Sequence, residues 1–318
     1  MIFTSGVTVL HDEWGIHSFE VLYVGAAADT YTDFNIDSEG RIYLCNKYGL
    51  FRKIPGGQFT KLSSTLISHI SFDNDQNAYG CLHITASGRT IYKIDLNGSV
   101  TTHATNIEFE YEGEMIPTYI NGLIIINNNL YFIGGICLFS QINLTGDFNT
   151  LGNMFNEYDY LLGTSDNNLY VIATSSTYGS KGIYKITNQP GSLEYIQSLV
   201  VSRKKLDFRF NEFNSDIYFQ YTPDVILKQT GGSGSFSNIY STLPVTTYGY
   251  VKIGILPNGN SYAFYADGDV YLKPSGGAWG YLFKLTGASG KPLKVKIFDN
   301  KVYVLYENGL FLAGFFYY

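Results

Sequence analysis

Short segments of alternating polar and apolar residues, separated by turns rich in Asn, Asp and Gly, recur along the whole chain. The clearest set comprises residues 158–165 (YDYLLGTS), 169–175 (LYVIATS), 182–188 (GIYKITN) and 193–199 (LEYIQSL). Alternation with a period of two is typical of β-strands, and the Asn- and Gly-rich turns supply the positive φ angles that tight hairpins need. Each set therefore predicts a four-stranded antiparallel meander, and no segment shows the sustained 3.6-residue period of a helix.

One phrase identifies a repeat: a turn, a small or aliphatic residue, a tyrosine and then apolar residues. It occurs seven times, with its tyrosine at Tyr43, Tyr79, Tyr131, Tyr170, Tyr218, Tyr262 and Tyr303. The intervals between these tyrosines are 36, 52, 39, 48, 44 and 41 residues, with a mean near 43. Such a period with four strands per unit is typical of a β-propeller, whose blades stack radially. Because the tyrosines stand beside apolar residues on second strands, we expect them to pack between blades, with hydroxyl groups bonded to polar partners.

The sequence thus predicts an all-β protein with a single domain, a seven-bladed β-propeller of four-stranded antiparallel blades. The expected blades span residues 33–64, 67–105, 118–153, 158–200, 207–243, 248–287, and 293–318 together with 1–24. The last unit ends before an outer fourth strand, and residues 17–24 (HSFEVLYV) resemble the outer strands of other units. We therefore expect this N-terminal strand to pair into the last blade and cover its open edge. Alternatively, residues 6–12 join as well, giving two strands from each end and leaving residues 309–318 over.

Composition limits the classes of function. Charged residues make up 15% of the 318 residues and aromatic residues 16%, whereas a typical soluble domain is about 25% charged. The net charge of −6 argues against a nucleic-acid binder, which normally presents a basic face. No apolar run is long enough to span a membrane and no signal segment stands at the start, so we expect cytoplasmic synthesis without secretion. The three cysteines have no framework spacing and are expected to be buried free thiols.

Several third strands continue into a Gly-Gly turn. Examples are residues 49–62 (GLFRKIPGGQFTKL), 224–239 (DVILKQTGGSGSFSNI) and 269–282 (DVYLKPSGGAWGYL), the last with Trp279. This style resembles the blades of tectonin-like and related lectin propellers, and it is similar to propellers of bacteriophage virions, in tail hubs, nozzles and receptor-binding platforms. The resemblance implies a glycan or other virion proteins as partners, although a propeller fold by itself does not decide between functions.

No catalytic constellation is recognisable in the sequence. Propeller glycosidases need two carboxylates near the centre of the ring, and the first-strand acids Asp33, Asp207 and Glu212 form no recognisable pair. The five histidines lack metal-binding spacing, and no nucleophile stands in a GxSxG context. We therefore expect no enzymatic activity, no cofactor and no metal.

Recognition is expected in the loops that join second to third strands and one blade to the next, because loops tolerate change and carry function. Together with Trp279, the candidate binding residues are Tyr48, Arg89, Glu110, Glu112, Tyr178, Lys181 and Asp267. Tyr178 is the strongest anchor, since a rigid ring contributes contact area for little loss of entropy. The two glutamates belong to an acidic run, residues 108–114, that either grips a basic partner or is a solvated connection.

Low charge combined with many aromatic residues suits a surface that neighbouring proteins cover. We therefore expect a non-enzymatic structural or host-contacting component of a bacteriophage virion, in the tail or neck, that acts through protein–protein contacts. Its expected partners are other virion or assembly proteins in a multimeric ring or complex, and its expected location is the virion. The alternative is a carbohydrate-binding, lectin-type propeller that binds a surface glycan. A second alternative is a propeller glycoside hydrolase.

Overall fold

The computed structural model describes residues 7–12, 15–24, 31–82, 90–111, 114–117, 120–134, 137–152, 155–163, 168–175, 181–186, 193–198, 209–213, 216–222, 225–230, 235–240 and 251–316. Within these residues lie six four-stranded sheets, one five-stranded sheet and one two-stranded sheet. The described helices are two short 3-10 turns, η1 (Ile142–Leu144) and η3 (Ala266–Gly268). The predicted all-β class of antiparallel four-stranded sheets is confirmed.

The larger sheets follow one another along the chain. The first contains β3 (Tyr31–Ile36), β4 (Ile42–Asn46), β5 (Gly49–Lys53) and β6 (Phe59–Ser63). The second contains β7 (Ile67–Phe72), β8 (Ala78–Leu82), β9 (Ile91–Ile94) and β10 (Val100–Ala104). A separate hairpin follows, formed by β11 (Glu108–Tyr111) and β12 (Glu114–Pro117). The third contains β13 (Ile120–Ile126), β14 (Asn129–Gly134), β15 (Cys137–Gln141) and β16 (Asn149–Gly152).

The remaining sheets keep the same order of strands. The fourth contains β17 (Phe155–Gly163), β18 (Leu169–Ser175), β19 (Lys181–Ile186) and β20 (Leu193–Ser198). The fifth contains β21 (Arg209–Phe213), β22 (Asp216–Thr222), β23 (Val225–Gln229) and β24 (Ser237–Tyr240). The sixth contains β25 (Val251–Ile255), β26 (Ser261–Tyr265), β27 (Asp269–Lys273) and β28 (Gly280–Lys284). The last contains β29 (Pro292–Phe298), β30 (Lys301–Tyr306), β31 (Gly309–Phe316), β2 (Gly15–Val24) and β1 (Val7–Asp12).

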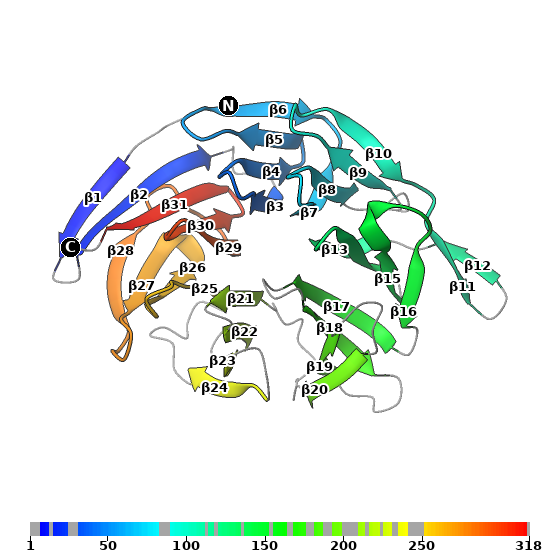
Figure 1. Ribbon diagram of the computed structural model, residues 1–318. Coiled ribbons are helices and arrows are strands. Elements are labelled where there is room, and N and C mark those ends of the chain that lie inside the picture. Colours follow the sequence, from blue (N-terminus) through cyan, green and yellow to red (C-terminus); the bar gives the residue numbers. More distant parts are fainter. Residues whose placement is uncertain are drawn as a thin grey trace.

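The sheets are arranged around a common centre, with the first strand of each nearest to it (Figure 1). Neighbouring first strands contact one another: β29 touches β25 on one side and β3 on the other, and β3 touches β7. The outer strands lie at the rim of the ring. This radial stack of antiparallel sheets is the β-propeller architecture that the repeat predicts.

The last sheet combines strands from both ends of the chain. β2 pairs with β31 from Ile16↔Phe316 to Val24↔Gly309, so the expected pairing of an N-terminal strand into this sheet is present. The alternative is correct in that residues 7–12 join this sheet as β1, but it is wrong in leaving residues 309–318 over, because β31 lies between β30 and β2. β1 adds a fifth strand outside β2, since β31 already occupies the other edge of β2.

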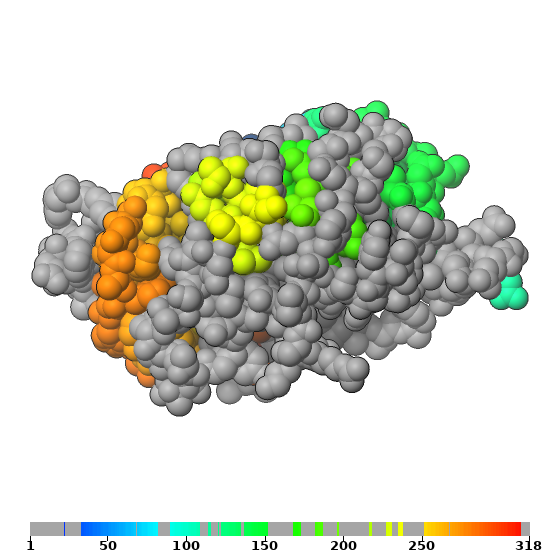
Figure 2. All heavy atoms as spheres, turned by 90° about the horizontal axis from the view of Figure 1, so that it is seen from below, coloured from blue at the N-terminus to red at the C-terminus, as the bar shows by residue number. Residues whose placement is uncertain are grey.

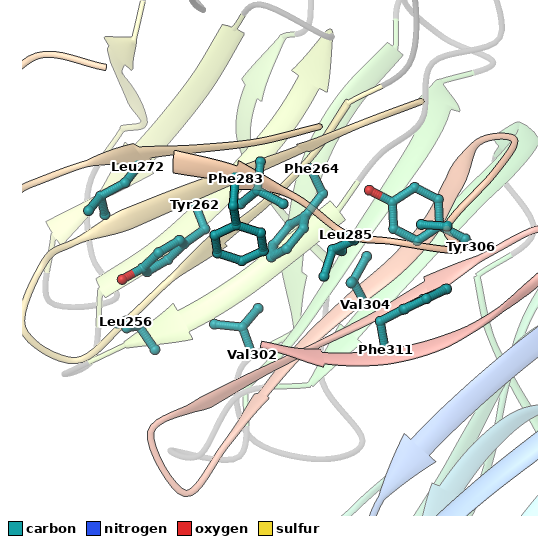
Figure 3. Close-up of a cluster of buried hydrophobic side chains, with 12 residues drawn as sticks. Leu256, Tyr262, Phe264, Leu272, Phe283, Leu285, Val302, Val304, Tyr306 and Phe311 are labelled. Atoms are coloured by element: carbon teal, nitrogen blue, oxygen red, sulfur yellow. The ribbon is translucent and has the colours of Figure 1, made fainter. Parts of the chain in front are cut away.

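Apolar clusters fill the space between neighbouring sheets. In one of them, Tyr262 and Phe264 of β26 and Phe283 of β28 face Val302 and Val304 of β30 (Figure 3). The cluster thus joins the sixth sheet to the last one by burial of apolar surface from both. All three cysteines are free and buried, as the sequence predicts.

The repeated tyrosines are part of these clusters. Among those whose side chains are described, the buried ones are Tyr43, Tyr79, Tyr131, Tyr170, Tyr262 and Tyr303. Tyr170 donates its hydroxyl hydrogen to Gln229 Oε1 of the fifth sheet at 2.9 Å, so packing between blades with a polar partner is confirmed there. The Tyr131 hydroxyl has no such partner among the described residues, and burial raises the pKa of Tyr131 to about 12.

This difference predicts unequal effects of removing the two hydroxyl groups. Tyr170→Phe is expected to lower the free energy of unfolding by about 1 to 2 kcal/mol, because it removes a buried hydrogen bond to Gln229 Oε1. Tyr131→Phe is the matched control and is expected to be neutral within about 0.5 kcal/mol. Urea denaturation of both variants measures the difference, and equal losses would show that the Tyr170 hydroxyl has no special role.

Candidate functional site

The predicted binding residues are spread over several loops. Tyr48 lies between β4 and β5 and is 47% exposed. Its backbone N–H donates to Asn46 Oδ1 at 2.8 Å, and Lys47 Nζ lies 4.9 Å from the centroid of its ring. The turn therefore holds an accessible aromatic ring beside a positive charge. Such a ring is not part of the buried core, so its surface is available for contact with a partner.

The other predicted residues are described to different extents. Trp279 is half-buried and packs against a cluster of sixth-sheet residues, namely Val251, Ile253, Ile255, Ala263 and Tyr265. Asp267 lies in η3, Lys181 is the first residue of β19, and Glu110 lies on β11. Arg89, Glu112 and Tyr178 lie outside the described residues. The structure thus places Tyr48 and Trp279 in connections of two different sheets, the first and the sixth.

The hairpin of β11 and β12 stands apart from the larger sheets. It projects from the rim of the ring (Figure 1), and its described atoms, in turquoise, lie at one end of the molecule in Figure 2. Met115 is 60% exposed, and Glu108 and Glu114 are also exposed. The sequence left this run open between a grip on a basic partner and a solvated connection, and the backbone pairs from Glu108↔Pro117 to Tyr111↔Glu114 as two strands. Alternating residue types, as in EFEY, favour this pairing.

A polar network joins the first strands of the last, first and second sheets. Asp33 of β3 lies between its neighbours: its Oδ1 accepts from Lys294 Nζ of β29 at 2.6 Å, and its Oδ2 accepts from the backbone N–H of Ile70 of β7 at 2.9 Å. Lys294 Nζ also lies 5.7 Å from the centroid of the Phe34 ring. One carboxylate thereby connects three sheets close to the centre of the ring.

Asn35, two residues further along β3, repeats this arrangement. Its Nδ2 donates to the Ile70 carbonyl at 2.6 Å, and its Oδ1 accepts from Lys296 Nζ of β29. Lys296 Nζ donates in addition to the Ile36 carbonyl at 3.1 Å. We call the set of Asp33, Asn35, Ile70, Lys294 and Lys296 the polar network.

An irregularity in β7 makes both polar groups of Ile70 available. The pairing of β7 with β8 shifts register between Ser68 and Ser71, and His69 has a φ of 54°. Such a bulge removes a residue from the strand ladder and leaves its backbone groups without ladder partners. Asp33 and Asn35 supply those partners, so the bulge and the two β3 side chains are complementary.

Burial and neighbouring charges set the protonation of this network. Burial alone raises the pKa of Asp33, but Lys294, His69 and the Ile70 N–H act in the other direction, and the pKa lies below its ordinary value. Burial, helped by the positive charge of Lys294, lowers the pKa of Lys296 to about 7, although Asp33 and Asp37 oppose this shift. At neutral pH the network therefore contains an ionised carboxylate, a paired lysine and a lysine close to its own pKa.

Sequence reasoning considered Asp33 only as a possible catalytic acid and did not identify the two lysines. The signal for them is the alternation in β29, PLKVKIF, which puts both lysines on the same face. Val295 and Ile297 pack instead toward the sixth sheet. Lys252 of β25 is a further buried lysine on a first strand, 1% exposed. These two first strands lie nearest the centre and are otherwise apolar. Lysines within them are thus the sequence signal for this site.

Within the described ranges no group of three or more His, Cys, Asp or Glu residues could hold a metal ion. In the part of the chain that the structure describes, no helix has both the length and the apolar character needed to cross a membrane.

Comparison with known proteins shows the fold. No protein-family model and no curated protein matches the sequence. A catalytically inactive virginiamycin B lyase from Staphylococcus aureus, solved with quinupristin, has a TM-score of 0.69 and 11% identity, covering 94% of this chain and 100% of that one. YCF48 from Cyanidioschyzon merolae has a TM-score of 0.65 and 12% identity, covering 93% and 98%. A gluconolactonase from Xanthomonas campestris has a TM-score of 0.56 and 11% identity, covering 99% of each chain.

These neighbours are β-propeller proteins, so the propeller fold is confirmed. The expectation that the chain is not an enzyme is contradicted, because structures that share its fold over nearly its full length include a lyase and a lactonase. The expectation rested on the lack of a local sequence motif. In a propeller, residues from different blades can meet at one face without forming such a motif. The named neighbours are neither tectonins nor virion proteins, so that resemblance stays a prediction.

Proposed function

We propose that this chain is a component of a bacteriophage virion, in the tail or neck, and that it works by binding other proteins of the particle. The observation that carries the proposal is the hairpin of β11 and β12, which projects from the ring with Met115 exposed at 60% (Figure 1). A two-stranded hairpin is marginally stable by itself, and an exposed apolar side chain costs free energy in water. A partner that covers the hairpin stabilises its two strands and removes the Met115 side chain from water.

The charge of the hairpin indicates the character of that partner. Residues 108–114 contain four glutamates, of which Glu108 and Glu114 are exposed in the structure. An acidic rim around an apolar contact fits a partner surface with an apolar pocket surrounded by Lys or Arg. Peptide binding occurs in this fold, since YCF48 has been solved bound to a D1 peptide. We propose protein recognition by the edge of the propeller for this chain.

Incorporation into particles tests the proposal. Met115→Ala is expected to reduce the amount of the protein in gradient-purified particles about tenfold, which corresponds to about 1.4 kcal/mol for the loss of one central contact. Thermal unfolding should be unchanged, because Met115 is exposed. Leu96→Ala is the matched control, since Leu96 is an exposed apolar residue elsewhere, and it should leave incorporation at the wild-type level.

Two results would contradict the proposal. One is the absence of the wild-type protein from purified particles. The other is equal incorporation of the Met115 and Leu96 variants, which would remove the hairpin from the contact surface. A glycan array on the same purified protein tests the lectin alternative, for which exposed rings such as Tyr48 and Tyr281 would supply the stacking surface.

A further inference from the structure

Lys296 has an environment that suits a neutral amine. Its Nζ donates to two acceptors, Asn35 Oδ1 and the Ile36 carbonyl oxygen, and neither acceptor is charged. Among the described residues no third acceptor is within hydrogen-bonding distance of Nζ. An ammonium group has three N–H donors, whereas a neutral amine has two and keeps a lone pair. The two acceptors therefore match the two hydrogens of the neutral form.

The carboxylates nearest to Lys296 are already paired with other cations. Asp33 Oδ1 accepts from Lys294 Nζ at 2.6 Å, and Asp37 Oδ2 accepts from Arg41 Nε at 2.5 Å. Lys294 contributes a second positive charge on the same face of β29, two residues away. A buried lysine beside another cation is disfavoured in its charged form, and lysines of this kind act as nucleophiles toward carbonyl compounds.

Lys296 lies on an inner strand of the ring. The residue is only partly buried, and β29 is one of the first strands that surround the centre (Figure 1). The lowered pKa of Lys296, about 7, agrees with the hydrogen-bond geometry. Among the described groups, those that act on its charge are Lys294 on its own strand and Asp33 and Asp37 of the first sheet.

We propose that Lys296 is a nucleophilic amine that binds a small aldehyde or ketone as an imine. The Nζ lone pair attacks the carbonyl carbon, the N–C bond forms, and the π electrons of the C=O bond move to oxygen. Proton transfer from nitrogen to oxygen gives a carbinolamine, which loses its hydroxyl group and the second amine hydrogen as water. The products are one imine and one water, and no oxidant or reductant is consumed. Hydrolysis reverses the reaction, so the site can bind and release the carbonyl compound.

Selective reductive labelling tests this proposal on the full chain. The protein is treated at pH 7 with acetaldehyde and sodium cyanoborohydride, which reduces the imine to a stable ethyl group, and labelled lysines are identified by peptide mass spectrometry. A lysine with a pKa near 7 is about half unprotonated at this pH, against about one in 2,500 for an ordinary lysine. Lys296 is expected to react roughly tenfold or more faster than Lys301, a lysine on the next strand whose side chain is 42% exposed.

Two variants at position 294 separate reactivity from a purely structural role. Lys294→Met frees Asp33 to pair with Lys296, so labelling of Lys296 at pH 7 should fall about tenfold and recover at higher pH. Lys294→Arg keeps the ion pair and should keep the labelling. The proposal is wrong if wild-type Lys296 reacts no faster than Lys301 at pH 7, and this comparison holds even if the Lys294→Met variant does not fold. Labelling of Lys296 does not depend on virion proteins. A failure of this proposal can therefore be distinguished from a failure of the proposed function.

Discussion

Removal of residues 1–24 is expected to abolish cooperative folding of this protein. The deletion removes β1 and β2, and β2 is the strand that pairs with β31 from Ile16↔Phe316 to Val24↔Gly309. Without it, β31 (GLFLAGFF) becomes an exposed, apolar edge strand with unpaired backbone groups. Such edges pair with other chains and aggregate. Size-exclusion chromatography should show soluble aggregates or no soluble protein, and thermal unfolding should lose its single cooperative transition.

A shorter deletion provides the matched control. Removal of residues 1–12 takes away β1, which lies outside β2 at the edge of the sheet, but leaves β2 paired with β31. This variant is expected to remain monodisperse and to unfold cooperatively, with a modest loss of stability. If the protein lacking residues 1–24 is also soluble and unfolds in one transition, pairing of the two ends is not what holds the last sheet together.

The features of the fold that the sequence predicts are those encoded locally. A tyrosine after a tight turn marks the second strand of each sheet, and Tyr43, Tyr170 and Tyr262 are buried in that position. The likeness of residues 17–24 to other outer strands predicts the pairing of β2 with β31 in the same way. The local sequence pattern does not decide on which side of β2 the strand β1 lies, because that depends on which edge of β2 is already paired with β31.

The candidate site was less predictable, because its members are distant in sequence. Asp33 is 37 residues from Ile70 and 261 residues from Lys294, and no spacing rule connects such positions. The bulge at His69 that exposes the Ile70 backbone groups has no turn signal in the residues around it, ISHISF. The Asp33 carboxylate and the Lys296 amine are brought near each other only when the two ends of the chain meet in the ring.

The last sheet thus connects residues from the two ends of the chain in an outer and an inner part. On the outside, β2 completes the strand ladder of β31. On the inside, Lys294 and Lys296 of β29 reach across to Asp33 and Asn35 of the first sheet. The outer part uses backbone hydrogen bonds along a whole strand, whereas the inner part depends on single side chains. A point substitution is therefore sufficient to test the inner part.

Asp33→Ala is expected to lower the free energy of unfolding at pH 7 by about 3 kcal/mol, because it leaves Lys294 without its carboxylate and the Ile70 N–H without its acceptor. This expected loss lies at the low end of the range for breaking a buried ion pair, since the Lys294 side chain is 23% exposed. Glu39→Ala is the matched control: Glu39 Oε2 lies 3.2 Å from Arg41 Nη1 with its side chain 63% exposed, and its loss should cost less than about 0.5 kcal/mol. Urea denaturation of the three proteins gives the comparison.

The pH dependence of this loss identifies the ionised carboxylate as its cause. The pKa of Asp33 is below its ordinary value of 3.8 in the folded state, so between the two values the unfolded chain binds more protons than the folded one, and stability rises with pH. The stability that Asp33 contributes is therefore fully present above about pH 5 and is lost as the pH falls through the folded-state pKa. The difference between wild type and Asp33→Ala should be constant from pH 5 to 6 and shrink below about pH 4. A difference that stays the same down to pH 3 would mean that Asp33 acts through packing and not through its charge.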